Sequence, residues 1–172
     1  MLNSSKSLFL FTMNDNNIIT YTDGSCHTQH RVGSWVAIVL AGDEKIILQG
    51  KAPDTTHHEM ELLAVINAIE YVYGHYAAET ALHVFSDSQY VTGLPGRKEK
   101  LQSAGFIVKK GNPVQHAELI KKLLLLLSQF PVILTKIPSH QKNDDGNTNY
   151  NTEADILSRQ LVRDEIRKHF GK

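Results

Sequence analysis

The alternation of hydrophobic and polar residues along this 172-residue chain predicts an α/β fold. Short runs rich in apolar and β-branched residues predict five strands, at residues 17–22, 33–40, 44–49, 81–85 and 132–136. Apolar residues at helical spacing predict three long helices, at 58–73, 115–129 and 151–168, and the segment 88–93 predicts a short one. This mixed order predicts a five-stranded mixed sheet with helices on both of its faces.

The remaining segments set the expected domain boundaries. Residues 1–16 are expected to form an N-terminal extension, because the apolar patch at 8–11 is too short to span a membrane and lacks a clear small-residue cleavage site. Residues 17–172 are expected to form one domain, which is long enough for a sizeable core. Within it, the glycine-rich segment 95–113 predicts a loop-rich excursion around a short helix, and 138–150 predicts a polar loop.

Four acidic residues stand where the predicted elements can bring them together. Asp23 and Asp87 follow the first and fourth predicted strands, while Glu61 and Asp155 lie near the starts of two predicted helices. Sites in such sheets gather at the carboxyl ends of strands. Crowded carboxylates repel one another unless a cation lies between them, and hard oxygen ligands suit Mg²⁺ or Mn²⁺. The pattern therefore predicts a divalent-cation site.

The net charge is zero, but the charges are distributed unevenly along the chain. Residues 1–96 hold four Lys and Arg against ten Asp and Glu, whereas residues 97–142 hold nine against two. Cations could neutralise the acidic part while phosphates contact the basic part, although a lysine-rich surface can also be merely solvated. Cys26 is the only cysteine, which excludes an intrachain disulfide and agrees with a reducing compartment.

Several short motifs, in order along the chain, resemble those of ribonuclease H of the bacterial and retroviral type. They are YTDGS at 21–25, TT at 55–56 followed by MEL at 60–62, SDSQYV at 86–91, PSHQ at 138–141 and NTEAD at 151–155. The resemblance spans residues 17–168. It implies an RNase H-like fold and a catalytic domain that cuts the RNA strand of RNA–DNA hybrids, leaving 5′-phosphate and 3′-hydroxyl ends.

The resemblance also implies roles for particular residues. Asp23, Glu61, Asp87 and Asp155 are expected to hold two Mg²⁺ or Mn²⁺ ions, and a pair of ions about 4 Å apart can activate a water and stabilise the leaving oxygen. His140 matches a mobile histidine that helps product leave or shuttles a proton. The expected contacts to nucleic acid are Ser25, Gln29, Thr56, His57, Ser88, Gln89 and Asn151, with Lys98, Lys109 and Lys110 in a basic handle.

The chain departs from the family pattern at the expected substrate contacts. His57 and His58 replace a pair of asparagines, and residues 27–31 replace a turn rich in Gly and Pro. The basic handle is diluted by the polar and small residues 102–104. These differences affect how the hybrid is contacted and leave the four acids intact.

Alternatives remain at the level of residues and of function. Glu59 competes with Glu61, Glu153 competes with Asp155, and Asp23 could simply form an Asx turn. A zinc site at the adjacent histidines is disfavoured, because no further Cys or His has suitable spacing. The competing functions are a non-catalytic hybrid-binding module and another nuclease of the same fold. We expect a free-standing cytoplasmic monomer, with a domain of a reverse transcriptase as the alternative.

Overall fold

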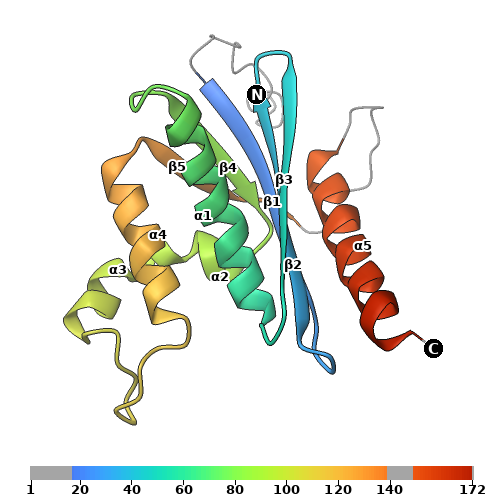
Figure 1. Ribbon diagram of the computed structural model, residues 1–172. Helices are drawn as coiled ribbons and strands as arrows, with labels where there is room; N and C mark the ends of the chain where they lie inside the picture. The colour runs from blue at the N-terminus through green and yellow to red at the C-terminus, as the bar shows by residue number, and fades with distance from the viewer. Residues whose placement is uncertain (1–16, 139–148, 172) are drawn as a thin grey trace, which may run out of the picture.

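The computed structural model describes residues 17–138 and 149–171. Its five strands form one sheet in the order β3-β2-β1-β4-β5, with α5 on one face and α1 and α4 on the other (Figure 1). The strands are β1 (Asn17–His27), β2 (Val32–Ala41), β3 (Glu44–Ala52), β4 (Ala81–Ser86) and β5 (Val132–Lys136). The helices are α1 (His57–His75), α2 (Gln89–Thr92), α3 (Leu94–Ser103), α4 (Ala117–Gln129) and α5 (Tyr150–Phe170). The predicted mixed sheet with helices on both faces is confirmed.

The first strand is longer than the sequence predicts. β1 pairs in parallel with β4 only as far as Thr22, but it stays paired with the antiparallel β2 as far as His27. The turn-prone sequence around Asp23 is held extended because each of its residues has a partner in β2. The prediction that this strand ends at residue 22, just before Asp23, is therefore wrong. Asp23 lies inside β1, one residue beyond its last pair with β4.

Two helices also begin or end differently from the prediction. α1 continues through Gly74 as far as His75, because the backbone N–H of Tyr76 still bonds to the carbonyl of Val72. In the excursion at 95–113, the helix α3 begins earlier, at Leu94, and tolerates Pro95 in its first turn. The end of α1 reflects local backbone hydrogen bonding, which the hydrophobic pattern does not report.

Alternation along the strands sends successive side chains to opposite faces of the sheet. On one face, buried residues of β1, β2 and β4 pack against α1 and α4. On the other face, Val36 and Ile38 of β2 pack against Ala154, Leu157 and Leu161 of α5. The same alternation directs Asp23 toward α5, whereas the neighbouring Gly24 faces α1. In the part of the chain that the structure describes, no helix is both long and apolar enough to cross a membrane.

The close approach of β1 to α1 depends on Gly24. A Cβ added there would lie 2.6 Å from the carbonyl carbon of Met60 and still closer to the backbone of Glu61. We expect Gly24→Ala to lower the free energy of unfolding by about 2 kcal/mol, because the helix backbone would have to move away. Gly74→Ala is the control, since its Cβ meets nothing within 4 Å, and it should stabilise α1 by about 0.5–1 kcal/mol.

Urea denaturation of both variants measures the two changes. An unchanged midpoint for Gly24→Ala would contradict the close packing of β1 on α1.

Candidate active site

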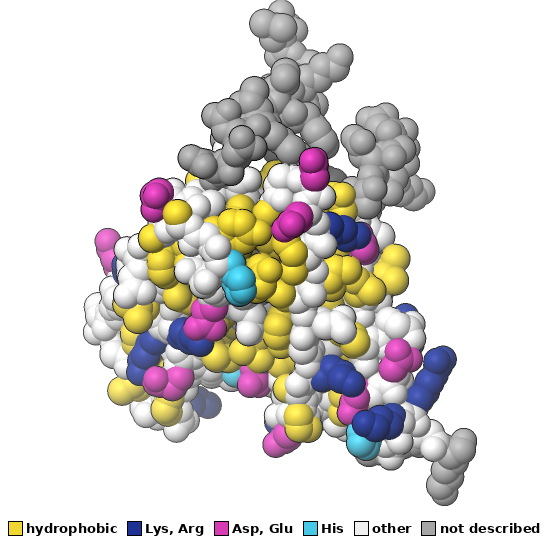
Figure 2. Space-filling model, turned by 45° about the horizontal axis from the view of Figure 1, so that its top comes forward, with side chains coloured by type: hydrophobic (Ala, Val, Ile, Leu, Met, Phe, Trp, Pro, Cys, Tyr) yellow, Lys and Arg dark blue, Asp and Glu magenta, His cyan; other side chains and the backbone are white. Residues whose placement is uncertain are grey.

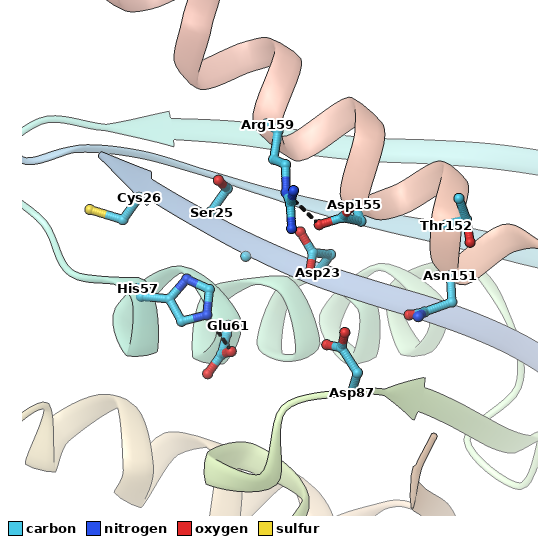
Figure 3. Close-up of a pocket in the computed structure, with 11 residues that line it drawn as sticks. Asp23, Ser25, Cys26, His57, Glu61, Asp87, Asn151, Thr152, Asp155 and Arg159 are labelled. Atoms are coloured by element: carbon cyan, nitrogen blue, oxygen red, sulfur yellow. Dashed lines mark ion pairs between the residues drawn. The ribbon is translucent and has the colours of Figure 1, made fainter. Parts of the chain in front are cut away.

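One pocket lies at the carboxyl edge of the sheet, between the N-terminal half of α1 and the N-terminal half of α5 (Figure 3). Four carboxylates from four separate elements line it: Asp23 of β1, Glu61 of α1, Asp87 directly after β4, and Asp155 of α5. The other lining residues are Gly24, Ser25, Cys26, His57, Asn151, Thr152 and Arg159. Four acids that are far apart in the chain are therefore brought together in one pocket, as predicted.

The carboxyl group of Asp23 has a strongly shifted pKa. Burial raises its pKa to about 7, and the nearby charges of Asp155 and Asp87 act in the same direction. A hydrogen bond from the hydroxyl of Ser158 to Asp23 Oδ2 opposes this rise. The pocket therefore concentrates negative charge in a half-buried place, a situation that a bound cation would relieve.

Glu61 is held from two sides. The hydroxyl of Ser88 donates to Glu61 Oε2 at 2.5 Å, and His57 Nε2 lies 2.8 Å from Glu61 Oε1. The hydrogen bond to Glu61 is the main reason that the pKa of His57 is raised. Glu59, the alternative ligand, instead accepts a hydrogen bond from Thr55 at 2.9 Å and does not line the pocket. The structure thus places Glu61, and not Glu59, beside the other acids.

Asp155 is paired with a cation of its own helix. Arg159 Nε lies 2.7 Å from Asp155 Oδ1, one helical turn away (Figure 3). Glu153, the alternative to Asp155, is bonded instead to Lys45 of β3 at 2.6 Å. Glu153 therefore stabilises the contact between α5 and β3, while Asp155 lines the pocket. Arg159 was not among the residues predicted from the sequence, although its i,i+4 spacing from Asp155 was a usable signal.

The carboxylates surround the pocket without forming a ready-made metal site. Among the described residues, no three His, Cys, Asp or Glu side chains are grouped closely enough to hold an ion. Asp23, Glu61 and Asp155 each bond to a partner within the protein. The donor set nevertheless fits a hard divalent cation, because four carboxylates and the amide of Asn151 face one polar pocket.

Some of the predicted substrate contacts belong to this pocket and others do not. Ser25, His57 and Asn151 line it. Ser88 is buried, where it holds Glu61 and also caps α2 by accepting from the N–H of Val91. These residues can influence the chemistry in the pocket directly or through Glu61.

The remaining predicted contacts lie away from the pocket lining. Gln29 is exposed in the turn between β1 and β2, and Gln89 is exposed at the start of α2. Lys98 is half-buried on α3, whereas Lys109 and Lys110 are exposed in the loop that follows it. The structure therefore does not gather all the predicted contacts at one point. His140 lies outside the described residues.

Thr56 has a partner that the sequence analysis did not identify. Its hydroxyl accepts from the N–H of Glu59 as the N-cap of α1, and it also lies 2.8 Å from His116 Nε2. His116 adopts a left-handed backbone conformation just before α4, and burial lowers the pKa of its ring. The 60 residues between these partners explain why no local pattern indicated the contact.

The fold and the acidic pocket define an α/β protein with a carboxylate-rich site at the carboxyl edge of its sheet. A family model described as RNase H matches residues 15–163. The chain is 32% identical over 148 residues to "Ribonuclease H" of Prosthecochloris aestuarii, which spans 85% of this chain and 95% of that protein. It is 34% identical over 152 residues to "Ribonuclease H" of Ruthia magnifica, covering 88% and 98% respectively. The chain belongs to the RNase H family, and the resemblance seen in the sequence is confirmed.

A solved structure supports the fold separately. The protein titled "LC9-RNase H1, a type 1 RNase H with the type 2 active-site motif" superimposes with a TM-score of 0.72 over 88% of this chain and 74% of that one. The sequence identity between the two is 18%, so the likeness shows a shared fold and no more.

Proposed function

We propose that this protein is a divalent-metal-dependent endonuclease that hydrolyses the RNA strand of RNA–DNA hybrids to 5′-phosphate and 3′-hydroxyl ends. The observation that carries the proposal is the convergence of Asp23, Glu61, Asp87 and Asp155 on one pocket in a chain of the RNase H family. Relatives of 30% identity or more over most of their length bear the name Ribonuclease H.

The four carboxylates would hold two Mg²⁺ or Mn²⁺ ions, which would supply activation of the attacking water and stabilisation of the charge on the phosphate. The chain's own residues prepare this pocket. Ser88 and His57 fix the carboxylate of Glu61, and burial keeps Asp23 in surroundings of low dielectric, where its charge interacts strongly with a cation. Ser25 and Asn151, which line the same pocket, offer polar groups to the substrate. For His140 we propose the part in product release or proton transfer.

The proposed function is tested by cleavage of end-labelled substrates in Mg²⁺ or Mn²⁺. We expect cutting of the RNA strand in an RNA–DNA hybrid and no cutting of duplex DNA, duplex RNA or single strands. Binding of the hybrid without cleavage would favour a non-catalytic module, and cleavage of duplex or branched DNA would favour another nuclease of this fold. The cytoplasmic location and the monomeric state expected from the sequence stay predictions.

We expect Lys98, Lys109 and Lys110 to contact the phosphates of the hybrid. The face seen in Figure 2 offers no continuous basic surface, because hydrophobic side chains lie in its middle and charged side chains of both signs lie around them. Replacing the three lysines by alanine should reduce the slope of log affinity against log salt by about 1–3, because fewer counterions are released on binding.

The matched control replaces Lys45 and Lys51, which lie on β3 at the far edge of the sheet, and should leave the salt slope unchanged. If the slope of log affinity against log salt were equal for the triple variant and the wild type, these three lysines would not contact the phosphates of the hybrid.

Arg159 should compete with the proposed ions for Asp155. Its guanidinium already neutralises this carboxylate at 2.7 Å, so a cation must displace it or share the ligand. We expect Arg159→Gln to bind Mn²⁺ about 2–5-fold more tightly in a calorimetric titration, because the competing positive charge is gone. Arg163→Gln, one turn further along α5 and exposed, should leave the affinity unchanged. If Arg159→Gln bound Mn²⁺ with unaltered affinity, the ion pair between Arg159 and Asp155 would not compete with ion binding.

A further inference from the structure

A fully buried serine on α5 connects three elements behind the pocket. The hydroxyl of Ser158 lies within hydrogen-bonding distance of Asp23 Oδ2 and 3.0 Å from the backbone carbonyl of Asp155. A hydroxyl has one hydrogen to donate, and an ionised carboxylate is a stronger acceptor than a peptide carbonyl. The hydrogen of Ser158 is therefore directed to Asp23 whenever that carboxylate is charged.

Ser158 is in turn held in place by a second buried serine. The hydroxyl of Ser34 on β2 donates to the backbone carbonyl of Ser158 at 2.5 Å, and both side chains are completely inaccessible to solvent. The two contacts run from β2 to α5 and from α5 to β1. They add polar contacts to the apolar packing of α5 on the sheet, and Asp155 and Arg159 lie on the same side of that helix as Ser158.

A hydrogen bond within the helix explains only one of the two contacts of the Ser158 hydroxyl. Serines in helices commonly bond back to a carbonyl of the preceding turn, as Ser128 of α4 does to Leu125 at 2.6 Å. Ser128 is exposed, so its hydroxyl costs little to accommodate. Ser158 instead lies fully buried beside the apolar contact of α5 with β2, where a hydroxyl is tolerated only if it is well bonded. Its charged partner, Asp23, lies 135 residues away in the sequence and lines the pocket.

We propose that Ser158 is a positioning residue for Asp23. Its hydroxyl fixes Oδ2 of that carboxylate and leaves Oδ1 to bind a cation. This inference rests on the proposed function, because it assumes that Asp23 is an ion ligand. Groups that orient the ligands of a metal without touching it commonly change its affinity by about 10–100-fold when they are removed. Ser34 holds the backbone of Ser158 in place and acts on Asp23 only through that residue.

The test is a calorimetric titration of Mn²⁺ into the full chain and its variants, each first shown to be folded by circular dichroism. We expect Ser158→Ala to weaken Mn²⁺ binding by about 10-fold or more. Ser34→Ala should weaken it less, because the Ser158 hydroxyl is still present. Ser128→Ala removes a helical hydroxyl with the same local hydrogen bond and should leave the Mn²⁺ affinity unchanged.

The outcomes separate this inference from the proposed function. Wild-type affinity in a folded Ser158→Ala protein would overturn the positioning role alone, whereas a wild type that binds no Mn²⁺ would overturn the proposed metal site and this inference with it. Hybrid cleavage gives a second readout, since Ser158→Ala should need more Mn²⁺ for half-maximal rate and recover much of its kcat at saturation. A loss of kcat that no concentration of Mn²⁺ restores would also contradict the proposal. Should the alanine variant fail to fold, Ser158→Cys takes its place, because a thiol keeps the size of the side chain but is a weak hydrogen-bond donor. Wild-type Mn²⁺ affinity in that variant overturns the inference.

Discussion

Asp155→Asn should reduce the rate of RNA–DNA hybrid cleavage by at least about 10³-fold while leaving the fold intact. The substitution keeps the size and shape of the side chain but removes the charge that the proposed ions require. It also releases Arg159, which would then place an unpaired positive charge beside the pocket. Single-turnover cleavage of a labelled hybrid measures the effect without interference from product release.

The control for this result lies two residues earlier on the same helix. Glu153→Gln removes the same type of charge but acts on the contact with Lys45 outside the pocket, so cleavage should stay within about 2-fold of the wild type. Equal losses in the two variants would mean that the charge of α5 matters and the pocket does not. Full activity of Asp155→Asn would exclude Asp155 as a ligand.

Asp23→Asn should stabilise the metal-free protein at neutral and alkaline pH, although it should abolish cleavage. Burial raises the pKa of Asp23 from 3.8 to about 7, so the folded protein holds this proton more tightly than the unfolded chain does. The corresponding stability is fully present below pH 3.8 and is lost as the pH rises through about 7. At pH 8 the wild type must keep a charged carboxylate half-buried, and asparagine avoids this cost, which is on the order of 2–4 kcal/mol.

Urea denaturation in the presence of a chelator, repeated from pH 5 to pH 8.5, measures this difference. The stability of Asp23→Asn should exceed that of the wild type increasingly as the pH rises, whereas Asp43→Asn, in the exposed turn between β2 and β3, should show no such trend. Excess Mg²⁺ should remove the advantage, because the wild-type carboxylate then has a cation as its partner. A pH-independent difference would show that Asp23 stays ionised at no cost.

The sequence predicted the mixed sheet and the four acids of the pocket because both follow from patterns along single elements. Within residues 17–138 and 149–171, apolar spacing located the five strands and the three longest helices, and the acids near the ends of these elements were expected to meet. The limits of β1 were missed because pairing with β2 keeps Asp23 extended, where the local sequence favours a turn. Pairing between strands is a tertiary effect, and it overrides local preference.

The partners of the acids were predicted less well, for a related reason. Arg159 and Ser158 stand four and three residues after Asp155, so a helical projection would have placed them on the same side of α5. That projection would not have shown that Ser158 reaches Asp23, because this contact depends on how α5 packs across β1 and β2. The contact between Thr56 and His116 likewise exists only through the packing of α1 against α4.

The proposed nuclease activity depends most on whether the four carboxylates bind divalent ions together. Anomalous diffraction from crystals grown with Mn²⁺ and a hybrid of non-hydrolysable backbone tests this directly, because manganese is located independently of any assumption about the site. We predict two Mn²⁺ ions in the pocket, with oxygen ligands from Asp23, Glu61, Asp87 and Asp155. Saturating Mn²⁺ that leaves this pocket without anomalous density, while the hybrid is bound, would contradict the account.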